Sequence, residues 1–501
     1  MSTPEGSVAA TGQLGERRLT TIHAIGQSLA VGPIFSAGLL TGLVASVAGF
    51  NTPLSVLLGT IGALALGYVI SVFAKRYAGA GAMYEYLARG ASPDVGIVGA
   101  GLYSIGLLFL GGGGVFIGLG FLADAFFTQH LSIDIAWWIW GLIGLALATG
   151  LNHFGVRLAI RGVLVLAALS SIPFIITAIV VIADGGANGN TLSVFDPGQT
   201  SWNDVFKGIL FAVTLFIGFE IAASLGEETE EPARSIPRAV LGTIAMSAVF
   251  YLLVTYAAAI GFGNGKGIEV WSASPSPIGD LAHQYVGKGM ATIIDLVVLL
   301  DAISVAIAFT VGASRIFFAL SRDRLLPRAL SGVTRHATPL GGNLVVVGAG
   351  IVAIIFGLAT NYGKAVGLPD EIMAFQITAG AGSFLVEFVY FMLALAALVL
   401  VWRERNAVVK VIVVLVGAAT PVLAYKGSLD PFPKYPFNRG FIFAAVAAGI
   451  VLLWYLFLKM RHPDRIKTAA QHASEHHGVA PLDETLDYKP GHGEPVVGPT
   501  H

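Results

Sequence analysis

The fold of this chain is decided by one stretch, WNDVFKGILFAVTLFIGFEIAASLGEETEEPARSIPR at residues 202–238. It begins as an apolar run long enough to enter a bilayer, but Gly218 and Glu220 stand where lipid tails would surround a helix. A carboxylic acid at such depth costs a few kcal/mol, so it usually faces a cavity or a partner and marks a working site. We therefore predict a broken transmembrane helix beside a solute pathway.

The composition indicates a membrane protein. Of the 501 residues 55% are hydrophobic and only 12% are charged, and the mean hydropathy of +0.77 is too high for a soluble globule. A net charge of -1 without a long basic run argues against a nucleic-acid partner. The absence of cysteine excludes disulfides and thiolate sites, and no motif of a metal centre, a cofactor or a catalytic residue is evident. We expect no enzyme activity.

Apolar stretches of about 20 residues, the length that crosses ~30 Å of hydrocarbon, recur along the chain. They predict an all-α integral membrane protein with twelve transmembrane helices. The predicted spans are 19–47, 53–73, 95–127, 136–151, 162–183, 205–225, 239–262, 290–320, 344–360, 372–401, 408–424 and 441–458.

The distribution of Lys and Arg tests this count, because cytoplasmic loops carry an excess of basic residues. With the amino terminus inside, 22 of the 29 Lys and Arg fall on the inner side. We therefore predict a multi-pass protein of the cell membrane, in contact with lipid, with both termini in the cytoplasm. The polar segments 1–18 and 461–501 are expected to be disordered tails. The outer residues are Lys207, Lys266, Lys288, Lys364, Lys426, Lys434 and Arg439.

Two spans are interrupted at corresponding places. The first span contains Gly32-Pro33, and the sixth, which starts on the opposite side of the membrane, contains Ile217-Gly218. Paired interruptions in an inverted repeat point to a midplane site, because unwound backbone offers free N–H and C=O groups to a polar solute. Alternatively, Gly-Pro only kinks a packed helix. A run of four glycines, residues 111–114, favours close helix packing, since it lacks the Lys-Ser or Lys-Thr of a phosphate loop.

Several motifs resemble those of permeases of the amino acid, polyamine and organocation (APC) superfamily. The strings GFE at 218–220, EE at 227–228 and PARSIPR at 232–238 resemble the sixth span and the following loop. The remaining strings are YAGAGAMYEY at 77–86, NHFGVR at 152–157 and SRIFFALSRD at 314–323. The likeness extends from about residue 20 to 459, in order.

The resemblance implies a leucine-transporter-like fold, in which a five-plus-five inverted repeat (19–402) is followed by two peripheral spans (403–460). It also implies that a small solute, an amino acid or a related amine, lies between the two breaks. Carbonyl groups around residues 214–217 would meet an amine, and Phe216 would act as a lid. The solute-binding residues implied are Leu29, Ala30, Val31, Gly32, Ile34, Thr214, Phe216, Ile217, Gly218 and Phe309.

Two positions depart from the family pattern. Pro33 has no N–H, although in the family this position would donate to the substrate carboxylate. An α-carboxylate could still accept hydrogen bonds from the amides of Gly32 and Ile34. A solute that is an amine without a carboxylate is nevertheless favoured more than it is for the family in general. Where many relatives have a lysine in the fifth span, this chain has Ser170. Either a sodium ion or another proton-binding group could replace that ammonium.

Glu220 occupies the acidic position of the family, directly after the break, and is our candidate for proton coupling. Asp301 lies eight residues before Phe309, and we expect it to face the outer vestibule. Thr310 and Ser314 share a helix face and are candidate sodium ligands together with Ser170, although such hydroxyls often bond to the preceding turn. Two measurements would distinguish proton from sodium coupling. One is uptake driven by a proton gradient compared with uptake driven by a sodium gradient at equal pH, and the other is the pH dependence of uptake in Glu220→Gln.

We predict secondary active transport of an amino acid or a related organic amine by alternating access, coupled to protons. The alternatives are a sodium-coupled transporter or an exchanger of polyamines or organocations, and a solute sensor on the same scaffold. A membrane enzyme would need paired acids on neighbouring spans, and no such pair is evident. An ATP-driven pump would need a nucleotide-binding motif, and the sequence has none. The sequence predicts neither the solute nor the oligomeric state.

Overall fold

The computed structural model describes residues 19–29, 32–77, 81–154, 156–334, 338–402, 404 and 406–475. Over these residues the protein is helical, and its β-pairing consists of two isolated bridges, Leu19 with Thr229 and Val333 with Pro339. A helix satisfies its backbone N–H and C=O groups internally, as hydrocarbon requires. The expected all-α membrane fold is confirmed.

The α-helices follow the predicted spans, and shorter helices lie in the loops. In the first half of the chain they are α1 (Thr21–Leu29), α2 (Pro33–Phe35), α3 (Thr41–Ala48), α4 (Thr52–Ala74), α5 (Met83–Gly90), α6 (Pro93–Leu107), α7 (Val115–Leu131), α8 (Trp137–Phe154), α9 (Val156–Asp184) and α10 (Trp202–Thr214). In the second half they are α11 (Pro232–Phe262), α12 (Lys266–Ala273), α13 (Pro277–Tyr285), α14 (Lys288–Arg322), α15 (Leu340–Ala359), α16 (Asp370–Val401), α17 (Ala407–Leu429), α18 (Asn438–Arg461) and α19 (Pro463–Glu475).

Tighter or wider helical turns continue several of these elements. Two π-helical segments, η1 (Ser36–Leu40) and η3 (Leu108–Gly114), join α2 to α3 and α6 to α7. The 3₁₀ segments are η2 (Gly49–Asn51), η4 (Ser193–Phe195), η5 (Pro197–Gln199), η6 (Phe219–Leu225), η7 (Arg328–Ser331) and η8 (Gly363–Val366). Single π-turns within helices are frequent at functional sites, and η1 and η3 both adjoin the site described below.

Ten segments of the described chain are long and apolar enough to cross a membrane. The first of them, Thr21–Ala74, covers nearly all of the predicted span 19–47 and the whole of the predicted span 53–73. Helix α8, the fourth predicted span, is not among the ten. The number of twelve therefore stays a prediction, while the multi-span architecture is confirmed.

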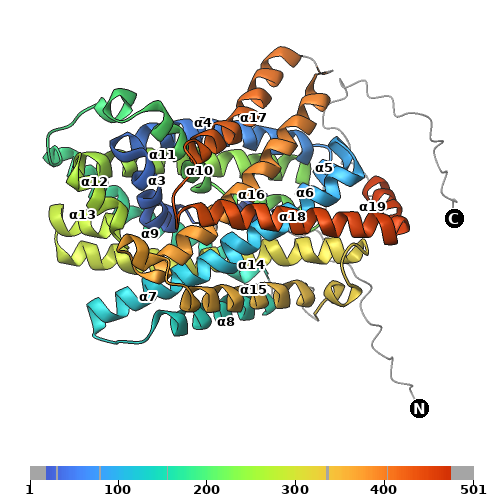
Figure 1. Ribbon diagram of the computed structural model, residues 1–501, viewed down its shortest axis with the longest axis horizontal. Coiled ribbons are helices and arrows are strands. Elements are labelled where there is room, and N and C mark those ends of the chain that lie inside the picture. The colour runs from blue at the N-terminus through green and yellow to red at the C-terminus, as the bar shows by residue number, and fades with distance from the viewer. Residues whose placement is uncertain are drawn as a thin grey trace.

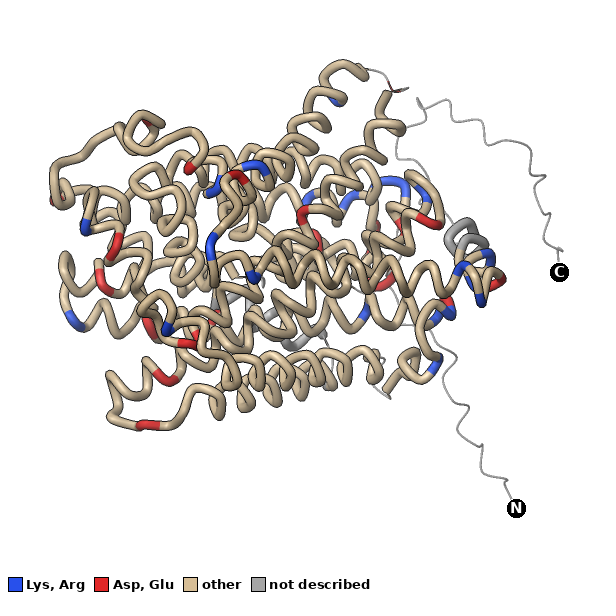
Figure 2. Tube along the Cα trace, in the orientation of Figure 1, with Lys and Arg blue, Asp and Glu red and all other residues tan. Residues whose placement is uncertain are grey.

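The short loop helices lie at opposite ends of the bundle. Helices α12 and α13 lie at one end and α5 and α19 at the other (Figure 1). Figure 2 shows Lys and Arg gathering towards the end with α5 and α19, whereas Asp and Glu lie at both ends. This gathering of basic residues follows the excess that we assigned to the cytoplasmic side.

Helix α19 differs from the disordered tail expected after residue 460. It starts at Pro463, which suits the first turn of a helix because its missing N–H needs no partner there. Its apolar side packs on the bundle, where Ala469 is buried and Ile466 contacts the core. Amphipathic packing, which composition does not reveal, therefore makes this segment helical as far as Glu475.

Candidate solute and coupling site

The first span is broken between α1 and α2. Leu29 ends α1, Ala30 and Val31 lie outside the described residues, and Gly32 has a φ of 80° before the helix resumes at Pro33. A Cβ on Gly32 would lie 2.2 Å from Cγ2 of Val305, so both space and backbone conformation require glycine. From Pro33 the chain is helical without interruption to Ala48.

The sixth span is broken between α10 and η6. Helix α10 ends at Thr214, the next four residues form a turn, and Gly218 has a φ of 113°. The turn closes on itself, since the amides of Phe216 and Ile217 donate to the carbonyls of Val213 and Thr214. The structure thus has an interruption at each of the two places that the sequence predicts.

Asp301 of α14 lies against the first break. Its Oδ2 accepts a hydrogen bond of 2.8 Å from the Phe35 amide, and its side chain is fully buried. The place of Asp301 in the outer vestibule, which we expect from its distance to Phe309 along the same helix, stays a prediction. In the structure the free amides of the broken first span hold its carboxylate.

Glu220 lies against the second break. Its Oε2 accepts a 2.7 Å hydrogen bond from the Gly218 amide, and its Oε1 accepts one of 2.9 Å from the Tyr103 hydroxyl of α6. Tyr390 of α16 also interacts with this fully buried carboxylate. Each break therefore has one buried carboxylate on a backbone amide, supplied by α14 at the first break and by η6 itself at the second.

Tyr251 of α11 connects the two breaks. Its hydroxyl donates to the Leu215 carbonyl at 2.7 Å and interacts with Ser36 at the start of η1. Its ring packs edge-on against Phe216, with centroids 5.0 Å apart. Phe216 is consequently held against α11 in this conformation, and the carbonyl of Leu215 already has a donor.

A small cavity of about 30 Å³ lies between the breaks. It brings together Thr214, Ile217 and Phe309 of the predicted solute site, while Gly32, Ile34, Phe216 and Gly218 do not line it. The Thr214 hydroxyl bonds to Ser383 of α16 at 2.8 Å. The other lining residues are Phe35, Ser36, Leu40, Leu110, Gly114, Val115, Val305, Phe375 and Ala379.

The glycine run of η3 brings the third span close to this cavity. A Cβ on Gly111 would lie 2.3 Å from the Phe309 ring, and one on Gly114 would lie 3.4 Å from the Thr378 hydroxyl. The run therefore serves close packing, as its sequence favours, and positions Phe309.

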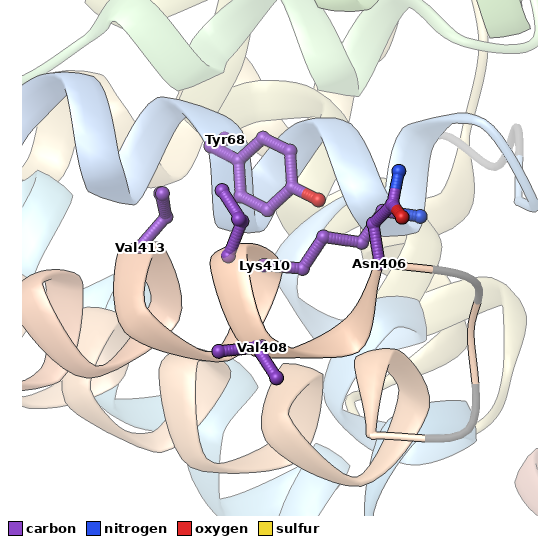
Figure 3. Close-up of a pocket in the computed structure, with 6 residues that line it drawn as sticks. Tyr68, Asn406, Val408, Lys410 and Val413 are labelled. Atoms are coloured by element: carbon purple, nitrogen blue, oxygen red, sulfur yellow. The ribbon is translucent and has the colours of Figure 1, made fainter.

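A second hollow, of about 540 Å³, lies between α4 and α17 (Figure 3). Its lining includes Val408 and Val409, which are 74% and 65% exposed, so it opens on the outer surface of the bundle. Figure 3 shows the Lys410 chain extending between Tyr68 and Asn406. Because both breaks lie elsewhere, we do not assign the solute to this hollow.

Comparison with known sequences identifies the family. The profile described as "Amino acid permease" matches residues 25–430, which is most of the chain. The chain belongs to the amino acid permease family. This family match, together with the apolar helices, agrees with the permease that the sequence analysis expects.

Individual relatives of this permease match over parts of their length. It is 26% identical to the amino-acid permease GAP5 of Candida albicans over 381 residues, 72% of this chain and 58% of the relative. It is 32% identical to the branched-chain amino acid permease BcaP of Bacillus subtilis over 142 residues, 27% of this chain and 29% of the relative. The permease thus spans less than two thirds of the length of either relative.

Among solved structures the permease resembles a manganese transporter of Eremococcus coleocola. The TM-score is 0.53 at 11% identity, and the match covers 90% of this chain and 95% of that one. Identity this low shows the fold alone, which is the leucine-transporter-like architecture that the motifs imply.

The three candidate sodium ligands of the permease differ in their hydrogen bonds. Thr310 donates to the Ala306 carbonyl at 2.7 Å and Ser314 to the Val311 carbonyl at 3.0 Å, so both bond to their own helix. Ser170 is fully buried, and its hydroxyl has no hydrogen-bond partner among the described residues.

Sequence reasoning missed three tyrosines of the permease, Tyr103, Tyr251 and Tyr390. Each is almost fully buried beside a break. Tyrosine in a membrane span normally lies near the headgroups, and a buried hydroxyl needs a partner. A tyrosine in the middle of an apolar span therefore indicates a buried hydroxyl with a polar partner, and this signal could have identified the three residues.

Proposed function

We propose that this protein is a secondary transporter that carries an amino acid or a related organic amine across the cell membrane by alternating access, with a proton on Glu220 as the coupling ion. Membership of the amino acid permease family supports the solute class. We assign the solute to the space between the two breaks, beside the backbone of residues 29–34 and of Thr214 to Gly218, with Phe309 at its side.

The observation that carries the coupling proposal is the position of Glu220. As a carboxylate it accepts hydrogen bonds from Gly218 and Tyr103 at the same time. As a neutral acid it has one O–H to donate and accepts hydrogen bonds less strongly, so protonation weakens or reverses at least one of these contacts. We propose that the change reaches the Gly218 amide, and with it the backbone break that would contact the solute, which couples the two binding events.

The test is concentrative uptake into liposomes that contain the purified protein, with an inward proton gradient in one set and an inward sodium gradient at equal pH in the other. Uptake should follow the proton gradient. Glu220→Gln imitates the neutral acid and should bind solute without pH dependence of uptake. Asp204→Asn, near the start of α10 in the other half of the same span, is the control that should behave as wild type. Accumulation driven only by sodium would contradict the proposal.

Sodium coupling is the second candidate, because Ser170 has a buried hydroxyl without a described partner. In that case Ser170 would bind the ion with Thr310 and Ser314, after these two hydroxyls release their own helix carbonyls. Ser170→Ala would then abolish sodium-driven uptake. The separate variant Glu220→Gln would show the same pH dependence of uptake as wild type.

For the membrane arrangement we propose the inverted-repeat core at residues 19–402, two peripheral spans at 403–460, and both termini in the cytoplasm. The gathering of Lys and Arg at the end with α5 and α19 in Figure 2 supports this orientation. The membrane we propose is the cell membrane.

A further inference from the structure

We propose that Asp301 is the binding site for the ammonium group of the solute, and that this solute is an apolar organic amine without a carboxylate. The inference rests on the proposed transport function and narrows it from amino acids and amines to amines. The inference follows from three properties of the first break. Its free amides already bind a carboxylate, one oxygen of that carboxylate has no described partner, and the adjoining cavity is apolar.

The first property is that the anion position of the broken span is already filled. The helix that starts at Pro33 offers its first free amides to an anion, and Pro33 itself has no N–H. The Phe35 amide donates to Asp301 at 2.8 Å, and the Ile34 amide also interacts with this carboxylate. A solute carboxylate at this helix end would meet the negative charge of Asp301.

The second property is the unpartnered carboxyl oxygen of Asp301. The side chain is fully buried, and among the described residues Oδ1 has no hydrogen-bond partner and no Lys, Arg or His pairs with the carboxylate. A buried ion is strongly disfavoured unless it is paired and hydrogen-bonded. An ammonium ion bound at Oδ1 supplies both a counter-charge and a donor.

The third property is the chemistry of the adjoining cavity. Val305 and Phe309 follow Asp301 by one and two turns on the same face of α14, and both line the cavity. Phe35 and Phe375 complete it with rings 6.5 Å apart. The lining contains no Lys or Arg that could hold a carboxylate, and its only side-chain donors are Ser36 and Thr214. The cavity therefore suits an aromatic or branched apolar group attached to the amine.

The experiment compares solutes that differ only by the carboxylate: phenylalanine with phenethylamine, and leucine with 3-methylbutylamine. Binding is measured by calorimetry on the purified full chain, and uptake is measured in the liposomes described above. Wild type should bind each amine about 30-fold or more tightly than the matching amino acid, which corresponds to an unfavourable contact between like buried charges.

The main variant is Asp301→Asn, which keeps an oxygen that can accept the Phe35 N–H and removes only the charge. It should lose about 30-fold or more of its affinity for both amines. Asp295→Asn is the matched control, because Asp295 lies on the same helix and bonds to His130 and Ser276, away from the breaks. Thermal unfolding of both variants verifies that they remain folded.

A second variant tests the occupied helix end directly. Pro33→Gly restores one backbone N–H, and Asp301→Ala removes the carboxylate that the amides of Ile34 and Phe35 contact. The double variant should therefore gain affinity for phenylalanine and leucine. Amino acids that bind wild type as tightly as the amines, or amine binding unchanged in Asp301→Asn, would overturn the inference while the proposed transport function stands. If none of the four solutes binds or accumulates, the transport proposal for this solute class fails together with the inference.

Discussion

Arg315 and Glu228 form a two-point ion pair, in which Nε lies 2.8 Å from Oε1 and Nη2 lies 3.4 Å from Oε2. The Arg315 side chain is fully buried. Glu228 also accepts the Leu19 amide on its main-chain carbonyl at 2.9 Å, so the segment before α1 is attached to the same turn. The contacts of Glu228 thus hold α14, the loop after η6 and the segment before α1 together.

Removal of one partner of this pair should destabilise the protein strongly. Arg315→Met leaves the buried Glu228 carboxylate without its counter-charge, which costs about 3–5 kcal/mol, whereas Arg315→Met with Glu228→Leu should recover most of that loss. Chemical unfolding in detergent measures both. Arg234→Met is the control: its pair with Glu231 is about half exposed or more, and its loss should cost about 0–1 kcal/mol. Equal losses for Arg315→Met and Arg234→Met would contradict the role of burial.

Tyr251→Phe should loosen the second break without removing the ring that packs on Phe216. The Leu215 carbonyl then loses its donor, and a buried unsatisfied carbonyl costs about 1–3 kcal/mol. Solute affinity should fall, and thermal unfolding should shift to lower temperature. Tyr256→Phe, on the same helix, is the matched control because it packs by its ring on Phe195. Identical behaviour of the two variants would show that the hydroxyl of Tyr251 has no role in holding the break.

The orientation can be tested because the chain contains no cysteine. Single cysteines at exposed loop positions should react with an impermeant maleimide according to side. Asn188→Cys, in the loop after α9, should react in intact cells, whereas Glu230→Cys and Lys467→Cys should react only after permeabilisation. Labelling of Lys467→Cys in intact cells would reverse the proposed orientation, and the three sites together also test the number of spans between them.

Glu404, in the loop before α17, should contribute stability that depends on pH. Burial alone would raise the pKa of this carboxyl, but the hydrogen bond from Lys410 and the guanidinium of Arg76 outweigh burial and hold the pKa below its ordinary value. A lowered pKa means stability that is present above the ordinary carboxyl pKa of about 4.3 and is lost as the pH falls through the folded value.

Glu404→Gln should therefore unfold at a lower temperature than wild type at pH 7, and the difference should shrink as the pH falls below about 4. Thermal unfolding over a pH series measures this. Glu269→Gln, an exposed position on α12 outside this ion-pair group, should match wild type at every pH. A difference for Glu404→Gln that is independent of pH would exclude the ion pairs as its cause.

The helical membrane fold and both breaks could be predicted because their signals are local. A bilayer needs about 20 apolar residues for a span, and Gly32 and Gly218 interrupt such runs. The site depends instead on contacts between distant segments. Asp301 meets Phe35 only because the broken first span turns its free amides towards α14, and Tyr251 reaches Leu215 from a different helix. The spacing of residues within one span does not reveal contacts between different spans. The sequence therefore indicated which polar residues stand in apolar spans but not which of them contact one another.

The cavity between the breaks, at about 30 Å³, is too small for a molecule the size of phenethylamine. Such a solute can bind there only after side chains that line the cavity have moved, so each association event has to wait for the protein to open. The observed rate of binding should then stop rising at high solute concentration and level off at the opening rate of the chain. The selectivity of this protein between solutes would accordingly be expressed in how long a solute stays bound, and much less in how fast it binds.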